Sequence, residues 1–218
     1  MHSVENTTDK YLLIDMGGLA GWAKVSGICG IIAPLAAFAG IFLAISNFGA
    51  FSWADNALSD LGALGQPTGI FFNTGLIAGG LLSAVFALGF FSLLGKGHLG
   101  KIGAAAFFLD SLALVAIGVF PSGVRPLHYY SSVAFFALFP IAGAAIGISL
   151  LKNGFARLAA LTLALAVVAA GVWLAHWTVL PFGSNVATPE VVAALAAGAW
   201  AAALGAKMLS GQQSAKVI

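Results

Sequence analysis

HYYSSVAFFALFPIAGAAIGISLL is the stretch from His128 to Leu151, and it contains no Asp, Glu, Lys or Arg. A helix needs about 20 apolar residues to cross the hydrocarbon core of a bilayer, and this run is long enough. A soluble domain needs a polar surface, and about a quarter of the residues in an ordinary domain are charged. Here only 7% of the 218 residues are charged and 61% are hydrophobic. The sequence therefore predicts an integral membrane protein.

Five similar stretches lie before and after this one. Together the predicted spans are 24–46, 71–94, 102–120, 128–151, 157–179 and 190–209. Short polar segments with glycine or proline separate them, as expected where a helix ends. We therefore expect a single all-α domain over 1–218, built as a polytopic bundle of six transmembrane helices. Small residues four apart, at Gly75/Gly79 and Gly143/Gly147, are typical of sites where such helices pack closely.

The distribution of basic residues predicts the orientation. One side of this topology holds Lys10, Lys24, Lys96, Lys101, Lys152, Arg157, Lys207 and Lys216, and the other side holds Arg125 alone. Because Lys and Arg concentrate in cytoplasmic segments, we expect a multi-pass protein of the cell membrane with both termini in the cytoplasm. Membrane lipids are the expected partners, and the lack of a basic run argues against nucleic acid. The pattern leaves the oligomeric state open.

The predicted outer side collects most side chains capable of catalysis or ligation. They are Asp55, Asn56, Ser59, Asp60, Asn73, Arg125, His128, His176 and Glu190. The longest outer loop, 52–66, is expected to form a short interfacial helix capped by Ser52 and lying across the mouth of the bundle. Structural roles are the alternative: capping for Ser59 and Asp60, membrane anchoring for His176, and a helix-dipole contact for Glu190.

Asp110 lies near the middle of the third span. An ionised carboxylate at that depth costs about 3 kcal/mol or more, and no Lys or Arg shares its level. We expect Asp110 to be neutral and to point into the bundle. It then serves either as a proton relay or polar pocket floor, or as an interhelical hydrogen bond.

Three segments resemble a known family. They are Ala57-Leu58-Ser59-Asp60-Leu61-Gly62, Phe72-Asn73-Thr74-Gly75, and Gly118-Val119-Phe120-Pro121 with His128 seven residues later. This pattern resembles an uncharacterised family of six-span membrane proteins of archaea and bacteria, the domain of unknown function nine-nine-eight. It is more distantly similar to the DRAM and Frag-type membrane proteins, some of which act in remodelling lipid anchors. The resemblance implies a site that includes Ser59, Asp60, Asn73 and His128, but no particular reaction.

Two classes of function remain open. The first is a hydrolase or transferase acting on a lipid or lipid-linked substrate, with Ser59 as nucleophile, His128 as general base and Asp60 orienting the histidine. A variant uses Asp60, His128 and His176 to hold a divalent metal such as zinc. The substrate would then contact a wider set of polar residues: Asp55, Asn73, Arg125, His176 and Asp110. The alternative is a proton-coupled carrier or a lipid-binding scaffold without catalysis.

Overall fold

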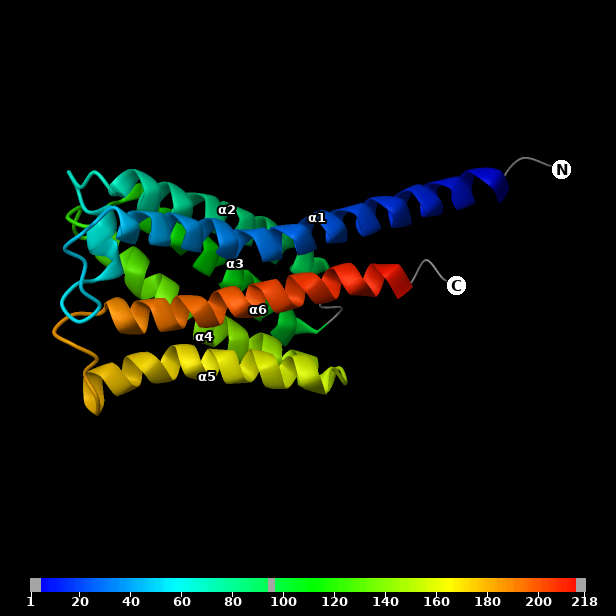
Figure 1. Ribbon diagram of the computed structural model, residues 1–218. Coiled ribbons are helices and arrows are strands. Elements are labelled where there is room, and N and C mark those ends of the chain that lie inside the picture. Colours follow the sequence, from blue (N-terminus) through cyan, green and yellow to red (C-terminus); the bar gives the residue numbers. More distant parts are fainter. Residues whose placement is uncertain (1–4, 94–96, 215–218) are drawn as a thin grey trace.

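The fold is a bundle of long helices (Figure 1). The computed structural model describes the backbone of residues 5–93 and 97–214 and the side chains of 21–91 and 97–210. The elements are α1 (Glu5–Ser46), the 3-10 helix η1 (Leu58–Gly62), α2 (Gly69–Leu93), α3 (His98–Val119), α4 (Leu127–Lys152), α5 (Ala156–Thr178) and α6 (Ala187–Ser214). No strand occurs within these ranges. The expected all-α fold is confirmed.

Each of the six α-helices contains a segment long and apolar enough to cross a membrane. The shortest, His98–Val119, has 22 residues, about 33 Å at the ~1.5 Å rise of an α-helix. The hydrocarbon core of a bilayer is about 30 Å thick. The chain is therefore an integral membrane protein with six spans in its described part.

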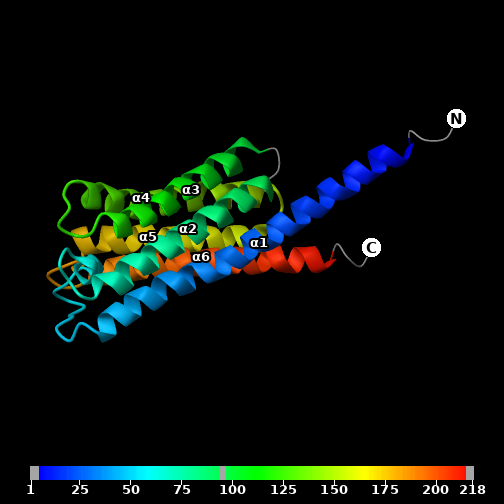
Figure 2. The ribbon, with the colours of Figure 1, turned by 90° about the horizontal axis from the view of Figure 1, so that it is seen from above.

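The helices form a closed ring in chain order. Each α-helix packs against the next along the chain, and α6 packs against α1. Both termini lie at one end of the bundle, which we call the terminal end, and α1 projects beyond the other helices there (Figures 1 and 2). The opposite end carries η1 and the long connections, and we call it the η1 end. A ring of six helices leaves space along its axis.

Close helix contacts and a buried aromatic cluster hold the ring together. A Cβ atom at Gly75 would lie 2.8 Å from the Cα of Gly40, so α1 and α2 approach each other at backbone distance. Towards the terminal end the axis is filled by Trp200, which is fully buried and has its ring 4.7 Å from that of Phe107. The indole Nε1 of Trp200 donates to Thr162 Oγ1 at 3.1 Å. The core is therefore dense at this end.

The loop expected as one interfacial helix is mostly irregular. Ser52 Oγ donates to Asp55 Oδ2 at 2.7 Å, and Ser52 N donates to Asn56 Oδ1 at 2.9 Å, which together close a turn. Only the five residues Leu58–Gly62 are helical, and they form a 3-10 helix. Leu58 and Leu61 are buried, so η1 packs into the end of the bundle. Ser52 closes a turn here and does not cap a helix.

Candidate functional site

A groove opens between α4 and α5 at the η1 end. Its volume is about 1430 Å³. The polar residues that line it are Ser59, Asp60, Ser122, Arg125, His128, Ser132, Asn185 and Glu190, and the larger apolar and aromatic ones are Tyr129, Tyr130, Val133, Phe136, Pro140, Trp173, Leu174 and Trp177. We call it the α4–α5 groove.

The two kinds of lining residue occupy different parts of this groove. Its polar residues come from η1, from the connections at the η1 end and from the first turns of α4 and α6. The apolar lining continues along α4 as far as Pro140, which is 13 residues beyond Leu127, or about 20 Å along the helix. The α4–α5 groove thus has a polar mouth and an apolar wall that reaches to the depth of the membrane spans.

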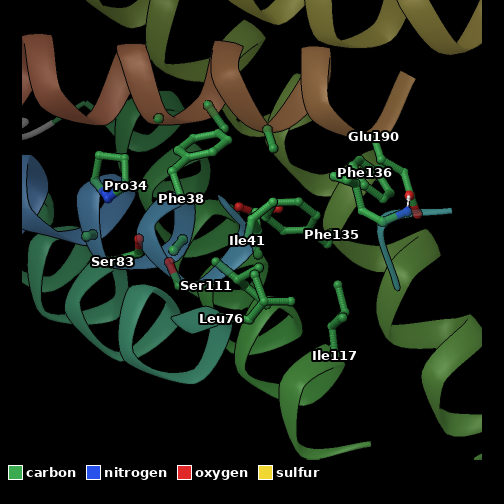
Figure 3. A pocket seen from close by; sticks show the side chains of 18 of the residues that line it. Pro34, Phe38, Ile41, Leu76, Ser83, Ser111, Ile117, Phe135, Phe136 and Glu190 are labelled. Atoms are coloured by element: carbon green, nitrogen blue, oxygen red, sulfur yellow. Dashed lines mark hydrogen bonds between the residues drawn. The ribbon is translucent and has the colours of Figure 1, made fainter. Parts of the chain in front are cut away.

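A smaller internal cavity of about 90 Å³ lies beside this groove, on the axis of the ring (Figure 3). Side chains from η1 and from every helix except α5 line it, and Asp110 is among them. Ser59, Ser132, Phe136 and Glu190 line both spaces. These four residues form the partition between the α4–α5 groove and the internal cavity.

Glu190 is a partition residue that was expected at this end of the bundle but was given no catalytic or binding role from the sequence. Its side chain is only 7% exposed, and its Oε2 accepts a hydrogen bond from the backbone N–H of Leu58 at 2.5 Å (Figure 3). Leu58 begins η1, where backbone N–H groups lack partners within the helix. Glu190 therefore caps η1 from a position 132 residues away in sequence. In sequence it is only an acid near the start of a span, and nothing local indicates this partner.

Asp60 and His128 both line the α4–α5 groove, but they are hydrogen-bonded elsewhere. The Asp60 carboxylate accepts from Ala57 N at 2.9 Å and from Asn56 Nδ2 at 3.1 Å. His128 Nδ1 donates to the Phe120 carbonyl at 2.8 Å, because a carbonyl oxygen can only accept. This leaves Nε2 of His128 as an acceptor, 3.5 Å from Ser132 Oγ. The relay expected from Ser59 through His128 to Asp60 is not formed in this structure.

His176 stabilises the turn that follows α5. Its Nδ1 accepts from the Phe182 backbone N–H at 3.2 Å, and its ring stacks on Phe182 with 6.1 Å between the centroids. His176 is buried and is not among the residues lining the α4–α5 groove. Within the described ranges no three His, Cys, Asp or Glu side chains are placed to hold a metal. The expected metal site of Asp60, His128 and His176 is therefore not formed.

The other expected binding residues are spread over three places. Arg125 is exposed at the mouth of the α4–α5 groove. Asp55 lies outside that groove, and hydrogen bonds from the hydroxyls of Ser52 and Ser184 (3.0 Å for Ser184) hold its pKa below the usual range. Asp110 lines the internal cavity, is 2% exposed, and has an Oδ1 without a hydrogen-bond partner. Only Arg125 of these three is placed to contact a ligand in the α4–α5 groove.

Asn73 and the glycines of the three motif segments hold the η1 end together. Asn73 Nδ2 donates to the Gly62 carbonyl at 3.1 Å and so fixes the end of η1 to α2. A side chain at Gly62 would overlap the Asn73 side chain, and a Cβ at Gly118 would lie 2.6 Å from the Asn73 carbonyl oxygen. His128 ties the start of α4 to the end of α3 through Phe120. The motif therefore describes a packed junction of η1 with α2, α3 and α4.

Comparison with known proteins gives one result. No curated protein and no solved structure matches the chain. A family model described as a protein of unknown function (DUF998) matches residues 31–207. The matched range runs from α1 to α6 and includes η1, the motif junction, the partition and both spaces. The chain belongs to the DUF998 family of proteins of unknown function.

Proposed function

We propose that this membrane protein binds a phosphate-bearing lipid, or a lipid-linked phosphate, in the α4–α5 groove. The head group would lie at the polar mouth and the hydrocarbon chain along the wall formed by α4 and α5. The observation that carries this proposal is the change from polar to apolar lining along one continuous groove. Most small-molecule sites are apolar clefts with a few polar groups at defined positions, and the α4–α5 groove is of this kind. The length of the groove also matches that of a lipid.

Arg125 supports the assignment of the head group. It is the one Lys or Arg among the described residues that line the α4–α5 groove, and it is exposed. A guanidinium presents paired N–H donors that match the oxygens of a phosphate. The hydroxyl of Ser59 and the second N–H of the Asn185 amide, whose first N–H donates to the Asp55 carbonyl, offer further donors at the mouth. Asp60 lines the same mouth, but its carboxylate already accepts from Ala57 N and Asn56 Nδ2, so we assign the head-group phosphate to Arg125.

We further propose that this mouth opens on the extracytoplasmic side of the cell membrane. Basic residues of the described part gather at the terminal end, on Lys24, Lys101, Lys152, Arg157 and Lys207. The η1 end has Arg125. Cytoplasmic segments carry the excess of Lys and Arg, so both termini are assigned to the cytoplasm. The lipid would then be taken from the outer leaflet.

Lipid binding without catalysis fits the geometry better than a hydrolase or transferase. Ser59 lies in the partition, and the Nε2 of His128 is placed to accept a proton, but the Asp60 carboxylate already caps the start of η1. A relay would require Asp60 or His128 to leave its present partner.

The test is lipid retention by the purified full-length protein in nanodiscs of phosphatidylglycerol and phosphatidylcholine, followed by native mass spectrometry. Ala137 lines the α4–α5 groove, and Ala144, two turns further along α4, is also exposed but lines neither space. Ala137→Trp should reduce retained lipid about tenfold, equivalent to about 1.4 kcal/mol. Ala144→Trp should retain as much as the wild type. Equal retention by both variants would contradict the proposal.

Catalysis is tested separately with His128→Ala and Ser59→Ala. If the wild type turns over a lipid-linked substrate and both variants lose that turnover while still retaining lipid, the protein is an enzyme and the scaffold assignment is wrong. If lipid is retained and no turnover is detected, binding alone is the function. Liquid chromatography of the lipids recovered from the nanodiscs gives this result directly.

A further inference from the structure

The internal cavity has features that the lipid proposal does not use. Its volume of about 90 Å³ exceeds the roughly 10–15 Å³ that one buried water needs, so it has room for several waters. Hydroxyls of Ser59, Ser83, Ser111 and Ser132 line it. Ser111 Oγ already donates to the Phe107 carbonyl at 2.8 Å, but each of the four hydroxyl oxygens can still accept a hydrogen bond from a water. The rest of the lining is apolar, so waters in this space would gather at these hydroxyls and at the carboxyl groups of Asp110 and Glu190.

Two acids are the ionisable side chains that line this cavity in the described part of the chain, and no basic side chain joins them. Asp110 Oδ1 has no partner in the protein although the residue is 98% buried. A buried polar atom without a protein partner is usually satisfied by ordered water. Since an unpaired negative charge inside a membrane is costly, the stable form of Asp110 there carries its proton.

The two acids lie at different depths. Asp110 is nine residues from the end of α3 at Val119, about 13 Å, whereas Glu190 is three residues from the start of α6 at Ala187, about 4.5 Å. In Figure 3 Glu190 lies at one end of the cavity, and Pro34 and Ser83 lie at the other. This separation is too long for a direct hydrogen bond, and two or three waters would bridge it.

The cavity has access at one end. Glu190 belongs to the partition, so one side of it faces the cavity and the other faces the α4–α5 groove. Beyond Glu190 the titratable groups of that groove are Asp60, Arg125, His128, Tyr129 and Tyr130. Towards the terminal end, Phe107 of the cavity wall packs on the buried Trp200. The aromatic cluster closes that direction.

We propose that the internal cavity is a proton-binding site in which waters connect Asp110 to Glu190 and thereby to solution at the η1 end. A proton leaves the Asp110 carboxyl along the waters to Glu190 and then to solvent, and a proton from solvent returns by the same route. No bond other than O–H bonds changes, and no further reactant is needed. This site is distinct from the lipid-binding groove and does not depend on a lipid being bound.

The test is infrared spectroscopy of the full-length protein in detergent after transfer to D₂O. The protonated carboxyl band of Asp110 is assigned by isotope-labelled aspartate and by its loss in Asp110→Asn. In the wild type this band should shift to the deuterated position within seconds. Glu190→Gln keeps an oxygen acceptor for Leu58 but cannot relay a proton as an acid does, and it should slow the shift about tenfold or more. Asp55→Asn, an acid at the same end but outside both spaces, should leave it unchanged.

Three results would overturn the proposal. The first is a wild-type band that stays protiated for hours, which would mean that the cavity is sealed. The second is the absence of a protonated aspartate band that depends on Asp110. The third is a folded Glu190→Gln variant that exchanges as fast as the wild type. Should that variant fail to fold, the wild-type exchange rate still decides whether water reaches Asp110. None of these results bears on the lipid proposal, which the separate retention experiment with Ala137→Trp decides.

Discussion

Glu190 joins two distant parts of the chain through the backbone N–H of Leu58. Both groups are buried, so loss of the carboxylate leaves a donor without a partner. Glu190→Ala should therefore lower the free energy of unfolding by about 1–3 kcal/mol. Glu190→Gln retains an acceptor oxygen and should cost less. Thermal unfolding of the detergent-solubilised variants measures the difference, and an Ala variant as stable as the Gln variant would show that this hydrogen bond contributes nothing.

Asp55 lies in the loop after α1 and makes the contact between that loop and the α5–α6 loop sensitive to acid. Its pKa in the folded protein lies below the ordinary 3.8, because the hydroxyls of Ser52 and Ser184 bond to the carboxylate. The stabilisation from this shift is therefore present above pH 3.8 and is lost as the pH falls through the lower folded value. We expect the backbone N–H of Asn185, which bonds to Ala54, to exchange with deuterium faster in that acid range.

The matched control for this acid response is Asp55→Ala. It should show the faster exchange at Asn185 already at neutral pH, relative to the intrinsic rate, and no further change on acidification. An acid response that persists in Asp55→Ala would assign the effect to another group.

Within η1, tight packing against α2 is the feature that one substitution can test. A methyl group at Gly62 would overlap Asn73, whereas a methyl group at Gly49 would meet nothing within 4 Å. Gly62→Ala should destabilise the protein by about 1–3 kcal/mol through overpacking, and Gly49→Ala should be nearly neutral. Unfolding temperatures of the two variants check this, and equal values would mean that η1 shifts freely to make room.

The helices were predictable from the sequence because the length of each apolar run is enough to decide them. An apolar run of more than 20 residues must hide its backbone polar groups in lipid, and a helix does so within the segment. The loop after α1 was not predictable, because Ser52, Asp55, Asn56 and Asp60 suit a helix cap and a turn equally well. The choice depends on burial of Leu58 and Leu61 and on the distant carboxylate of Glu190.

The sequence predicted at which end of the bundle the candidate site residues lie, but not which contacts their side chains make. Six spans bring Ser59, Asp60, Arg125 and His128 to one end of the bundle, and all four line the α4–α5 groove. His176 lies at the same end of the bundle, but its ring accepts a hydrogen bond from Phe182 in the turn after α5. Which way a side chain faces depends on the rotation of its helix against its neighbours, and an apolar run contains little of that information.

At the scale of the whole molecule, the basic residues predict which end faces the cytoplasm. With Cys29→Ser as background, a cysteine at Asn153 tests the terminal end, and a cysteine at Leu64, 73% exposed, tests the η1 end. A membrane-impermeant maleimide added to intact cells should label Leu64→Cys and not Asn153→Cys. Lysed cells should label both. The reverse pattern in intact cells would invert the topology.

The lipid assignment also concerns the molecule as a whole, because the α4–α5 groove hollows its surface from a polar mouth at the η1 end down to the depth of the membrane spans. Photo-crosslinking tests it directly. Phosphatidylglycerol with a diazirine in its acyl chain is irradiated with the protein in nanodiscs, and labelled peptides are mapped by mass spectrometry. We predict labelling concentrated on α4 between Tyr129 and Pro140 and on α5 near Trp173, and its loss in Ala137→Trp. Labelling spread evenly over exposed positions such as Leu81 and Leu109, and unchanged in Ala137→Trp, would contradict the account.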